Sequence, residues 1–182
     1  DGTVVAIGAR HNYGNGFQSG HVRVYQYSNG AWTQLGNDID GESANDNSGY
    51  SVSLSSDGTV VAIGAITNGN NNGHVRVYQY SNGAWTQLGN DIDGEFPQDF
   101  LGHSVSISDD GSTLATIAYQ GNDDNSGYAK IHQYSNGVWT QVGNDIDGEY
   151  PADALWSVSL SSDGNTVAVG TPYNDENGEQ SG

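Results

Sequence analysis

Hydrophobic and polar positions alternate along the chain in short runs. Apolar and small residues alternate over 50–55, and a nearly continuous apolar run covers 59–65. Alternation predicts a half-buried strand, whereas a short continuous run predicts a strand covered on both faces. A second alternating run spans 74–80, and a shorter fourth run spans 84–88. Because no segment keeps a helical period, we expect four strands in this unit and almost no helix.

Turn residues separate these runs. Ser56, Asp57 and Gly58 join the first two runs, and a loop rich in Asn and Gly follows the second. Asn82-Gly83 lies between the third and fourth runs, which predicts a type I′ hairpin with both residues at positive φ. The unit therefore has the pattern of a small antiparallel meander.

The same unit recurs along the chain. Asp-Gly pairs at Asp57, Asp110 and Asp163 follow one another at intervals of 53 residues. A four-stranded unit repeated at roughly 40–50 residues is typical of a β-propeller blade. We therefore predict an all-β fold of tandem four-stranded antiparallel blades, in an incomplete ring or an open, polymeric array. The single array 1–182 then divides into a partial blade with strands two to four (1–49), two blades (50–102 and 103–155) and a partial blade with strands one and two (156–182).

The start of each unit resembles the FG-GAP repeat of integrin-α-type β-propellers. In that family an aromatic-glycine pair opens the blade, and here Gly49-Tyr50, Gly102-His103 and Leu155-Trp156 stand at that place. Similar repeats occur in large secreted proteins of aquatic microbes, so the resemblance implies an extracellular location. The family's calcium loop is missing, because turns such as 108–111 offer fewer than the 6 to 8 oxygens that Ca²⁺ prefers.

Three repeats with a fraction at either end are fewer than the four to eight blades of typical propellers. Incomplete blades leave strand edges that pair with other chains. The expected partners are therefore other copies of this chain or the rest of a longer chain.

Charge narrows the classes of partner. Acidic residues outnumber basic residues 22 to 4, for a formal net charge of −18. Nucleic acid is excluded, because phosphate binding requires clusters of Lys and Arg, and anionic membranes are disfavoured for the same reason. No apolar run reaches the roughly 20 residues of a membrane span, so we expect no membrane insertion.

An acidic connector follows the fourth strand of each unit. Alternate carboxylates around a glycine resemble half of an EF-hand loop, so we expect weak Ca²⁺ binding, in the millimolar range of extracellular modules. The alternative is that these residues cap turns between blades. The candidate metal ligands are Asp38, Asp40, Glu42, Asp46, Asp91, Asp93, Glu95, Asp99, Asp145, Asp147, Glu149 and Asp153.

Aromatic and cationic side chains also recur once per unit. A tryptophan repeated in this way is typical of packing between blades, although a sugar-stacking ladder has the same pattern. We assign blade packing to Trp32, Trp85, Trp139, Tyr50, His103 and Trp156. The cations Arg23, Arg76 and Lys130 stand at equivalent third-strand positions, and we expect them to pair with acids of a neighbouring strand or blade.

The sequence indicates no catalytic residues. His103 shares its repeat position with Tyr50 and Trp156, and His132 shares its position with Tyr78, which indicates packing roles. We therefore expect a non-enzymatic extracellular structural or adhesive module that builds a fibre or surface assembly, without a certain cofactor. The first alternative is a Ca²⁺-assisted propeller that binds glycans or cell-surface proteins. The second is a glycoside hydrolase-type propeller.

Overall fold

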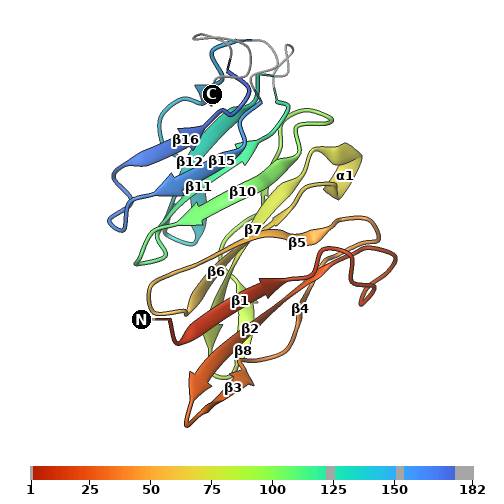
Figure 1. Ribbon diagram of the computed structural model, residues 1–182, viewed down its shortest axis with the longest axis vertical. Helices are drawn as coiled ribbons and strands as arrows, with labels where there is room; N and C mark the ends of the chain where they lie inside the picture. The colour runs from red at the N-terminus through yellow and green to blue at the C-terminus, as the bar shows by residue number, and fades with distance from the viewer. Residues whose placement is uncertain (1, 122–125, 151–153, 175–182) are drawn as a thin grey trace.

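Four antiparallel sheets follow one another along the chain in a computed structural model that describes residues 2–121, 126–150 and 154–174. Figure 1 shows them stacked along the long axis, from the N-terminal sheet (red) to the C-terminal sheet (blue). We call them the first to fourth blades. The first contains β1 (Val4–Gly8), β2 (His21–Ser28), β3 (Ala31–Gln34) and β4 (Ile39–Asp40); the second, β5 (Ser48–Leu54), β6 (Val60–Ala65), β7 (His74–Ser81), β8 (Ala84–Gln87) and β9 (Ile92–Asp93); the third, β10 (Leu101–Ile107), β11 (Thr113–Ala118), β12 (Tyr128–Ser135), β13 (Val138–Gln141) and β14 (Ile146–Asp147); the fourth, β15 (Ser157–Leu160) and β16 (Val167–Gly170).

In each of the first three blades the expected fourth strand is present and is followed by a further short strand. In the second blade β8 pairs with the outer half of β7, where Trp85 lies opposite Tyr80. β9 pairs with the inner end of β7, where Asp93 lies opposite His74. The Leu88 N–H donates to the Val77 carbonyl (2.7 Å) where the chain leaves β8. The acidic connector is therefore part of the sheet rather than a free loop, which the pattern of residues did not predict.

The tight turns follow the local sequence. In the hairpin between β7 and β8, Asn82 has φ 51° and Gly83 has φ 84°, so the predicted positive φ at both residues is confirmed. The loop between β6 and β7 contains one short helical turn, α1 (Asn68–Asn71). No helix among the residues placed here is long and apolar enough to cross a membrane.

The hydrophobic core lies between the blades, because β6 and β11, the second strands of the two central blades, are buried on both faces. Val61 and Ile63 of β6 pack with Val22 and Val24 of the first blade. Val60 on the opposite face of β6 packs in the cluster that continues into the third blade. A third cluster joins the third and fourth blades. The continuous apolar run of the sequence thus serves two interfaces at once.

Neighbouring blades approach closely near their innermost strands. A Cβ atom added to Gly64 would lie 2.1 Å from the Gly102 carbonyl oxygen, so only glycine fits there. In the next repeat Ile117 replaces Gly64 and Leu155 replaces Gly102, and both side chains belong to the cluster between the third and fourth blades. The innermost strands therefore meet through backbone contact between the second and third blades, and through side chains between the third and fourth blades.

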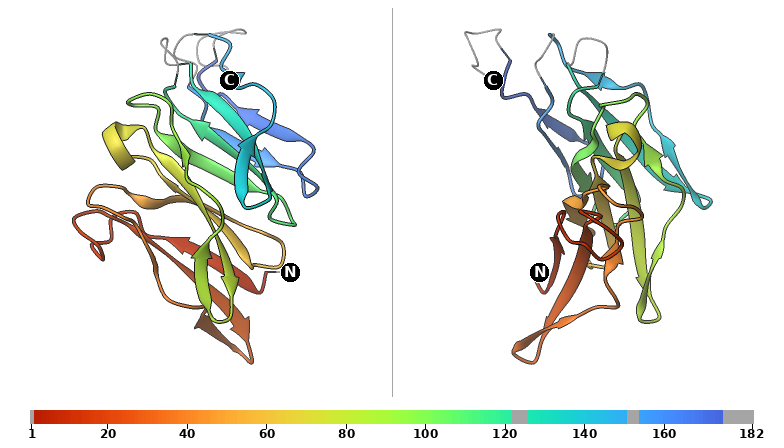
Figure 2. Two further views of the ribbon diagram at one scale, coloured as in Figure 1. Left: turned by 180° about the vertical axis from the view of Figure 1, so that it is seen from behind. Right: turned by 90° about the vertical axis from the view of Figure 1, so that its right-hand side faces the viewer.

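The outer hairpins spread apart while the innermost strands stay together. β10 contacts both β5 and β15, the first strands of its neighbouring blades. The right-hand view of Figure 2 shows the hairpins of the first two blades projecting as separate fingers, which gives the stack its fan shape. This arrangement exposes one edge of each outer hairpin and places the acidic connectors between adjacent blades.

Candidate functional site

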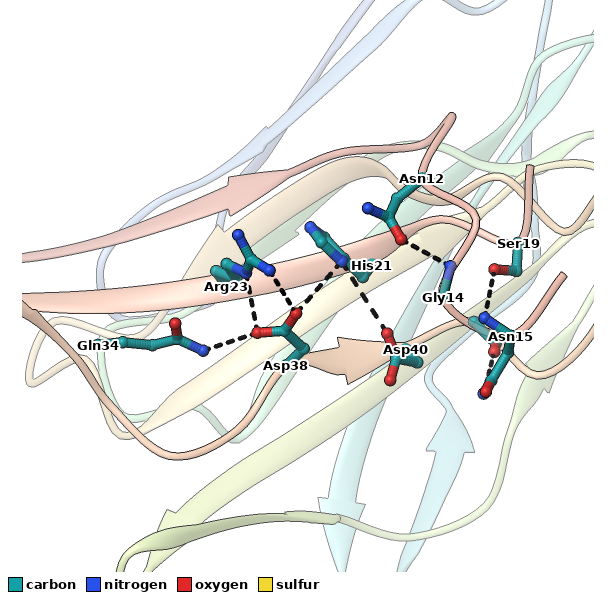
Figure 3. Close-up of polar contacts among 10 residues, drawn as sticks. Asn12, Gly14, Asn15, Ser19, His21, Arg23, Gln34, Asp38 and Asp40 are labelled. Atoms are coloured by element: carbon teal, nitrogen blue, oxygen red, sulfur yellow. Dashed lines mark hydrogen bonds and ion pairs between the residues drawn. The ribbon is translucent and has the colours of Figure 1, made fainter. Parts of the chain in front are cut away.

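The first acidic connector surrounds an arginine of its own blade (Figure 3). The Arg23 guanidinium donates two hydrogen bonds to the Asp38 carboxylate, at 2.8 and 2.7 Å, and the Gln34 amide donates a third at 2.8 Å. These donors, Arg23 above all, lower the pKa of Asp38 to about 2. His21 Nδ1 lies 3.5 Å from Asp38 and 4.0 Å from an oxygen of Asp40. The connector is thus held against the third strand of its blade.

The second connector repeats this arrangement and adds a contact from the preceding blade. Arg76 donates to both oxygens of Asp91, at 3.0 and 2.6 Å. A second carboxylate, Glu42 of the first blade, lies 2.6 Å from the same guanidinium. The side chain of Arg76 is only 14% exposed, against 43% for Arg23, which has no such neighbour among the described residues. One cation therefore joins two blades.

The third connector uses a lysine in the same way. The Lys130 ammonium contacts Glu95 of the second blade and lies 3.7 Å from Asp145 of its own blade. Its side chain is 5% exposed. The expected pairing of the cation column is therefore observed in the structure, and its partners come from both the same blade and the preceding one.

Two further connector acids are buried and fix the chain where one blade passes to the next. Asp46 accepts a hydrogen bond from the Ser43 N–H (2.7 Å), and Asp99 accepts one from the Phe96 N–H (2.8 Å). The Tyr128 hydroxyl of the third blade also donates to Asp99, at 2.6 Å. Burial, with this bond to Asp99, raises the pKa of the Tyr128 hydroxyl. These two carboxylates cap turns, which is the alternative role that the sequence left open.

The remaining proposed ligands lie on the surface. Asp40, Asp93, Asp147 and Glu149 are exposed, and Asp153 lies outside the described residues. Among the described residues, two groups offer three ligand atoms within 4.8 Å of one another, namely His21 with Asp38 and Asp40, and His74 with Glu42 and Asp91. A cationic side chain already binds carboxylates in both groups, and three ligands are fewer than Ca²⁺ takes. Ca²⁺ at these positions stays a prediction.

The tryptophan column also joins blades. The Trp85 indole N–H donates to the Leu35 carbonyl of the first blade (2.8 Å), and Trp139 donates to the Leu88 carbonyl of the second (2.7 Å). Each indole lies over a glycine of the preceding blade, Gly36 or Gly89, where a Cβ would come within 3.0 Å. All three tryptophans contact a tyrosine of their own blade, but Trp32 has no preceding blade in the described structure and stays 50% exposed.

The second aromatic column forms a row across the innermost strands. The ring centroids of Tyr50 and His103 are 5.1 Å apart, and those of His103 and Trp156 are also 5.1 Å apart. The Tyr50 hydroxyl and His103 Nε2 are within hydrogen-bond distance at 3.1 Å. Tyr119, which the sequence did not single out, stacks on His103 at 4.9 Å. Comparison of the repeats could not identify Tyr119, because Ile66 occupies the same place in the preceding repeat and no aromatic residue recurs there.

His74, His103 and His132 are packed among other side chains, which favours the neutral form of each ring. Burial lowers the pKa of His74 and His103, and burial beside Lys130 lowers the pKa of His132 to about 4. None of these rings has the serine and acid partners of a nucleophilic triad in the hydrogen bonds of the residues that the structure describes.

Comparison with known proteins places the whole repeat array in one fold. A family model described as the Rax2 C-terminal beta propeller domain matches residues 3–172. A search of curated proteins found no match. Among solved structures, a complex of KlAtg21 with the coiled-coil of AgAtg16 is 16% identical, with a TM-score of 0.60 over 86% of this chain and 45% of that chain. A candidate 6-phosphogluconolactonase from Bacteroides uniformis ATCC 8492 is 15% identical, with a TM-score of 0.56 over 84% of this chain and 41% of that chain.

These matches confirm the all-β, propeller-type fold predicted from the repeats. This chain spans less than half the length of either solved chain, and at such low identity the likeness shows the fold alone. The matching family is a β-propeller family, but the match does not support the FG-GAP repeat in particular, which stays a resemblance.

Proposed function

This chain belongs to the family of Rax2 C-terminal β-propeller domains, and we propose that it is an extracellular structural and adhesive repeat module that builds a fibre or another surface assembly. It works by joining blades rather than by catalysis. The extracellular location rests on the resemblance of its repeats to those of large secreted proteins, and the structural role rests on the joints between blades.

The observation that carries this proposal is the use of the charged and aromatic columns. In the described part of the chain, Arg76 and Lys130 each bind acids from two blades, and Trp85 and Trp139 each donate to the preceding blade. These side chains would be the obvious candidates for chemistry or ligand binding, yet they are occupied in contacts between repeats. A module built in this way is suited to bearing load and to adding further repeats.

Two surfaces of the described structure each carry half of the contact that joins neighbouring blades. One is the outer face of the first blade, and the other is the exposed part of the third blade. On the first blade Ile7, Tyr27 and Trp32 are 52%, 46% and 50% exposed. On the third blade Val142 and Ile146 are 50% and 40% exposed, whereas the equivalent Ile92 is 4% exposed. Gly143, which corresponds to Gly36 and Gly89 beneath the tryptophans, has no heavy atom of the described structure within 4 Å of its Cβ position.

These faces complement each other, so the occupant we propose is a second copy of the same chain. Trp32 of one copy would reach the Val142 carbonyl of the next, and Arg23 would approach Glu149, as Trp85 and Arg76 do inside the chain. Contacts between two different faces build a filament when the rotation from one copy to the next does not close into a ring. In such a contact β16 of one copy and β1 of the other compete for one place in the shared blade, so one strand must be displaced.

Light scattering over a range of protein concentrations tests the assembly, and electron microscopy shows its form. We expect a mass that rises with concentration, and rods at high concentration. Trp32→Ala should weaken the association at least tenfold, as should Glu149→Arg. Phe96→Ala removes a similarly exposed aromatic side chain (56%) from the connector between the second and third blades and should change nothing. A constant monomer mass for the unaltered chain would contradict the proposal.

A further inference from the structure

A pocket of about 310 Å³ opens beside the row of aromatic residues on the innermost strands. Its lining comes from three blades and consists of Tyr50, Ile66, Phe100, His103, Tyr119, Gln120 and Trp156. Four of these seven side chains are aromatic rings other than histidine, and none is an acid or a permanent cation. This neutral lining contrasts with the rest of the chain, whose formal net charge is −18.

Trp156 meets its neighbouring rings at steep angles, whereas Tyr119 stacks on His103 at 20°. Tyr119 and Trp156 are nearly perpendicular, at 80° with centroids 5.4 Å apart, and His103 meets Trp156 at 67°. Tyr50 completes the row from the other side, tilted 44° to His103. Perpendicular rings form corners rather than a flat platform, and a corner of ring faces surrounds a rounded group better than a planar one.

One cation already lies on this row. The Arg10 guanidinium carbon is 4.9 Å from the centroid of the Tyr50 ring, within the distance of a cation–π contact. Tyr50 therefore binds a positive group on one side while it lines the pocket. Burial lowers the pKa of His103, so this ring is neutral at pH 7 and adds no repulsion toward a second cation.

Phe100 is held in an unfavourable backbone conformation where it lines the pocket. Its φ is 54°, in the left-handed region that bulky residues avoid. In the preceding repeat Asn47 stands at this place with φ 55°, and asparagine tolerates the region well. A phenylalanine therefore stands in a strained conformation where it lines the pocket, and strain of this kind concentrates at binding sites.

We propose that this pocket binds a quaternary ammonium group, such as that of choline. Ring faces without a carboxylate favour a large, weakly hydrated cation over a small, strongly hydrated one. The acidic molecule around the pocket raises the local concentration of cations. This inference uses none of the cations, acids or tryptophans that form the proposed joint between copies, so it stands or fails independently of the proposed assembly.

Calorimetric titration with choline tests the site, with quenching of tryptophan fluorescence as the optical readout. We expect a dissociation constant on the order of 1 mM. The uncharged analogue of choline, in which carbon replaces nitrogen, should bind at least tenfold more weakly. Equal affinity for the two would overturn the proposal and indicate a merely apolar pocket, and binding of neutral sugars instead of choline would overturn it in favour of a glycan site.

Variants with a matched control locate the binding. Trp156→Ala should weaken choline binding at least tenfold, whereas Trp32→Ala removes a tryptophan of similar exposure (50% against 45%) and should leave it unchanged. Tyr119→Ile provides a second variant that is expected to fold, because Ile66 stands at that place in the preceding repeat. Unchanged affinity in a folded Tyr119→Ile variant would contradict the proposed site.

Discussion

The first and third blades contain nearly the same outer hairpin in two different environments. Trp32 and Trp139 occupy equivalent positions, yet Trp32 is 50% exposed and Trp139 is 5% exposed. The cations below them differ in the same direction, since the side chain of Arg23 is 43% exposed and that of Lys130 is 5% exposed. Residues at equivalent repeat positions therefore contribute differently to stability, because a preceding blade is needed to complete each joint.

The largest effect that this comparison predicts is for the tryptophans. Trp139→Ala should reduce the free energy of unfolding by about 3–5 kcal/mol, since it empties a packed position and removes the hydrogen bond to Leu88. Trp32→Ala should cost about 1 kcal/mol or less, because half of that side chain already faces solvent. Urea denaturation of both variants measures the difference. Equal losses would show that the outer hairpins do not depend on a preceding blade.

Acid should destabilise the third blade more than the other blades. Burial beside Lys130 lowers the pKa of His132 from 6.5 to about 4. The unfolded chain therefore takes up this proton first, so the contribution to stability is complete above pH 6.5 and is lost as the pH falls toward 4, by roughly 3 kcal/mol.

The repeats supply the variant that tests this expectation. Tyr25 and Tyr78 stand at the place of His132, so His132→Tyr should fold and should reduce the loss of stability between pH 6.5 and 4. His11→Tyr, at an exposed loop position, is the control and should leave the pH profile unchanged. Thermal melting at a series of pH values gives the profile, and an identical slope in His132→Tyr and the unaltered chain would refute the role of His132.

The arginines should show a smaller version of the same contrast. Arg76→Gln leaves Glu42 and Asp91 without their shared partner and should cost about 1–2 kcal/mol. Arg23→Gln removes a more exposed pair and should cost about 0–1 kcal/mol. Both values should fall in high salt, the second more completely. Chemical denaturation at two salt concentrations checks the order, and a larger loss for Arg23→Gln would reverse it.

Calcium should have the smallest effect. We propose weak binding at the first connector, where no carboxylate from a preceding blade approaches Arg23 in the described structure and Asp38 and Asp40 lie beside His21. Millimolar Ca²⁺ should then stabilise the chain by about 1 kcal/mol relative to chelator. Asp40→Asn should abolish the difference, and Asp93→Asn should keep it. An unchanged melting midpoint of the unaltered chain in Ca²⁺ and in chelator would contradict the proposed binding.

The local patterns of the sequence were sufficient to predict the strands and turns. Alternating and continuous apolar runs depend only on which faces of a strand are covered, and Asn-Gly turns depend only on local backbone sterics. The short strand β9 was missed, because the pairing of Ile92 and Asp93 with β7 depends on a chain that leaves the sheet after β8 and returns to it. No local pattern of residues marks where the chain leaves the sheet or where it returns.

The sequence by itself determined the blades, because a repeat of alternating runs and glycine turns has one compact local solution. Only the tertiary structure decided what the side chains between the blades do. Glu42 and Arg76 are 34 positions apart along the chain, and their contact depends on how two sheets stack. The aromatic pocket has the same origin, since Tyr50, His103 and Trp156 come from three different blades and meet only where the innermost strands lie side by side.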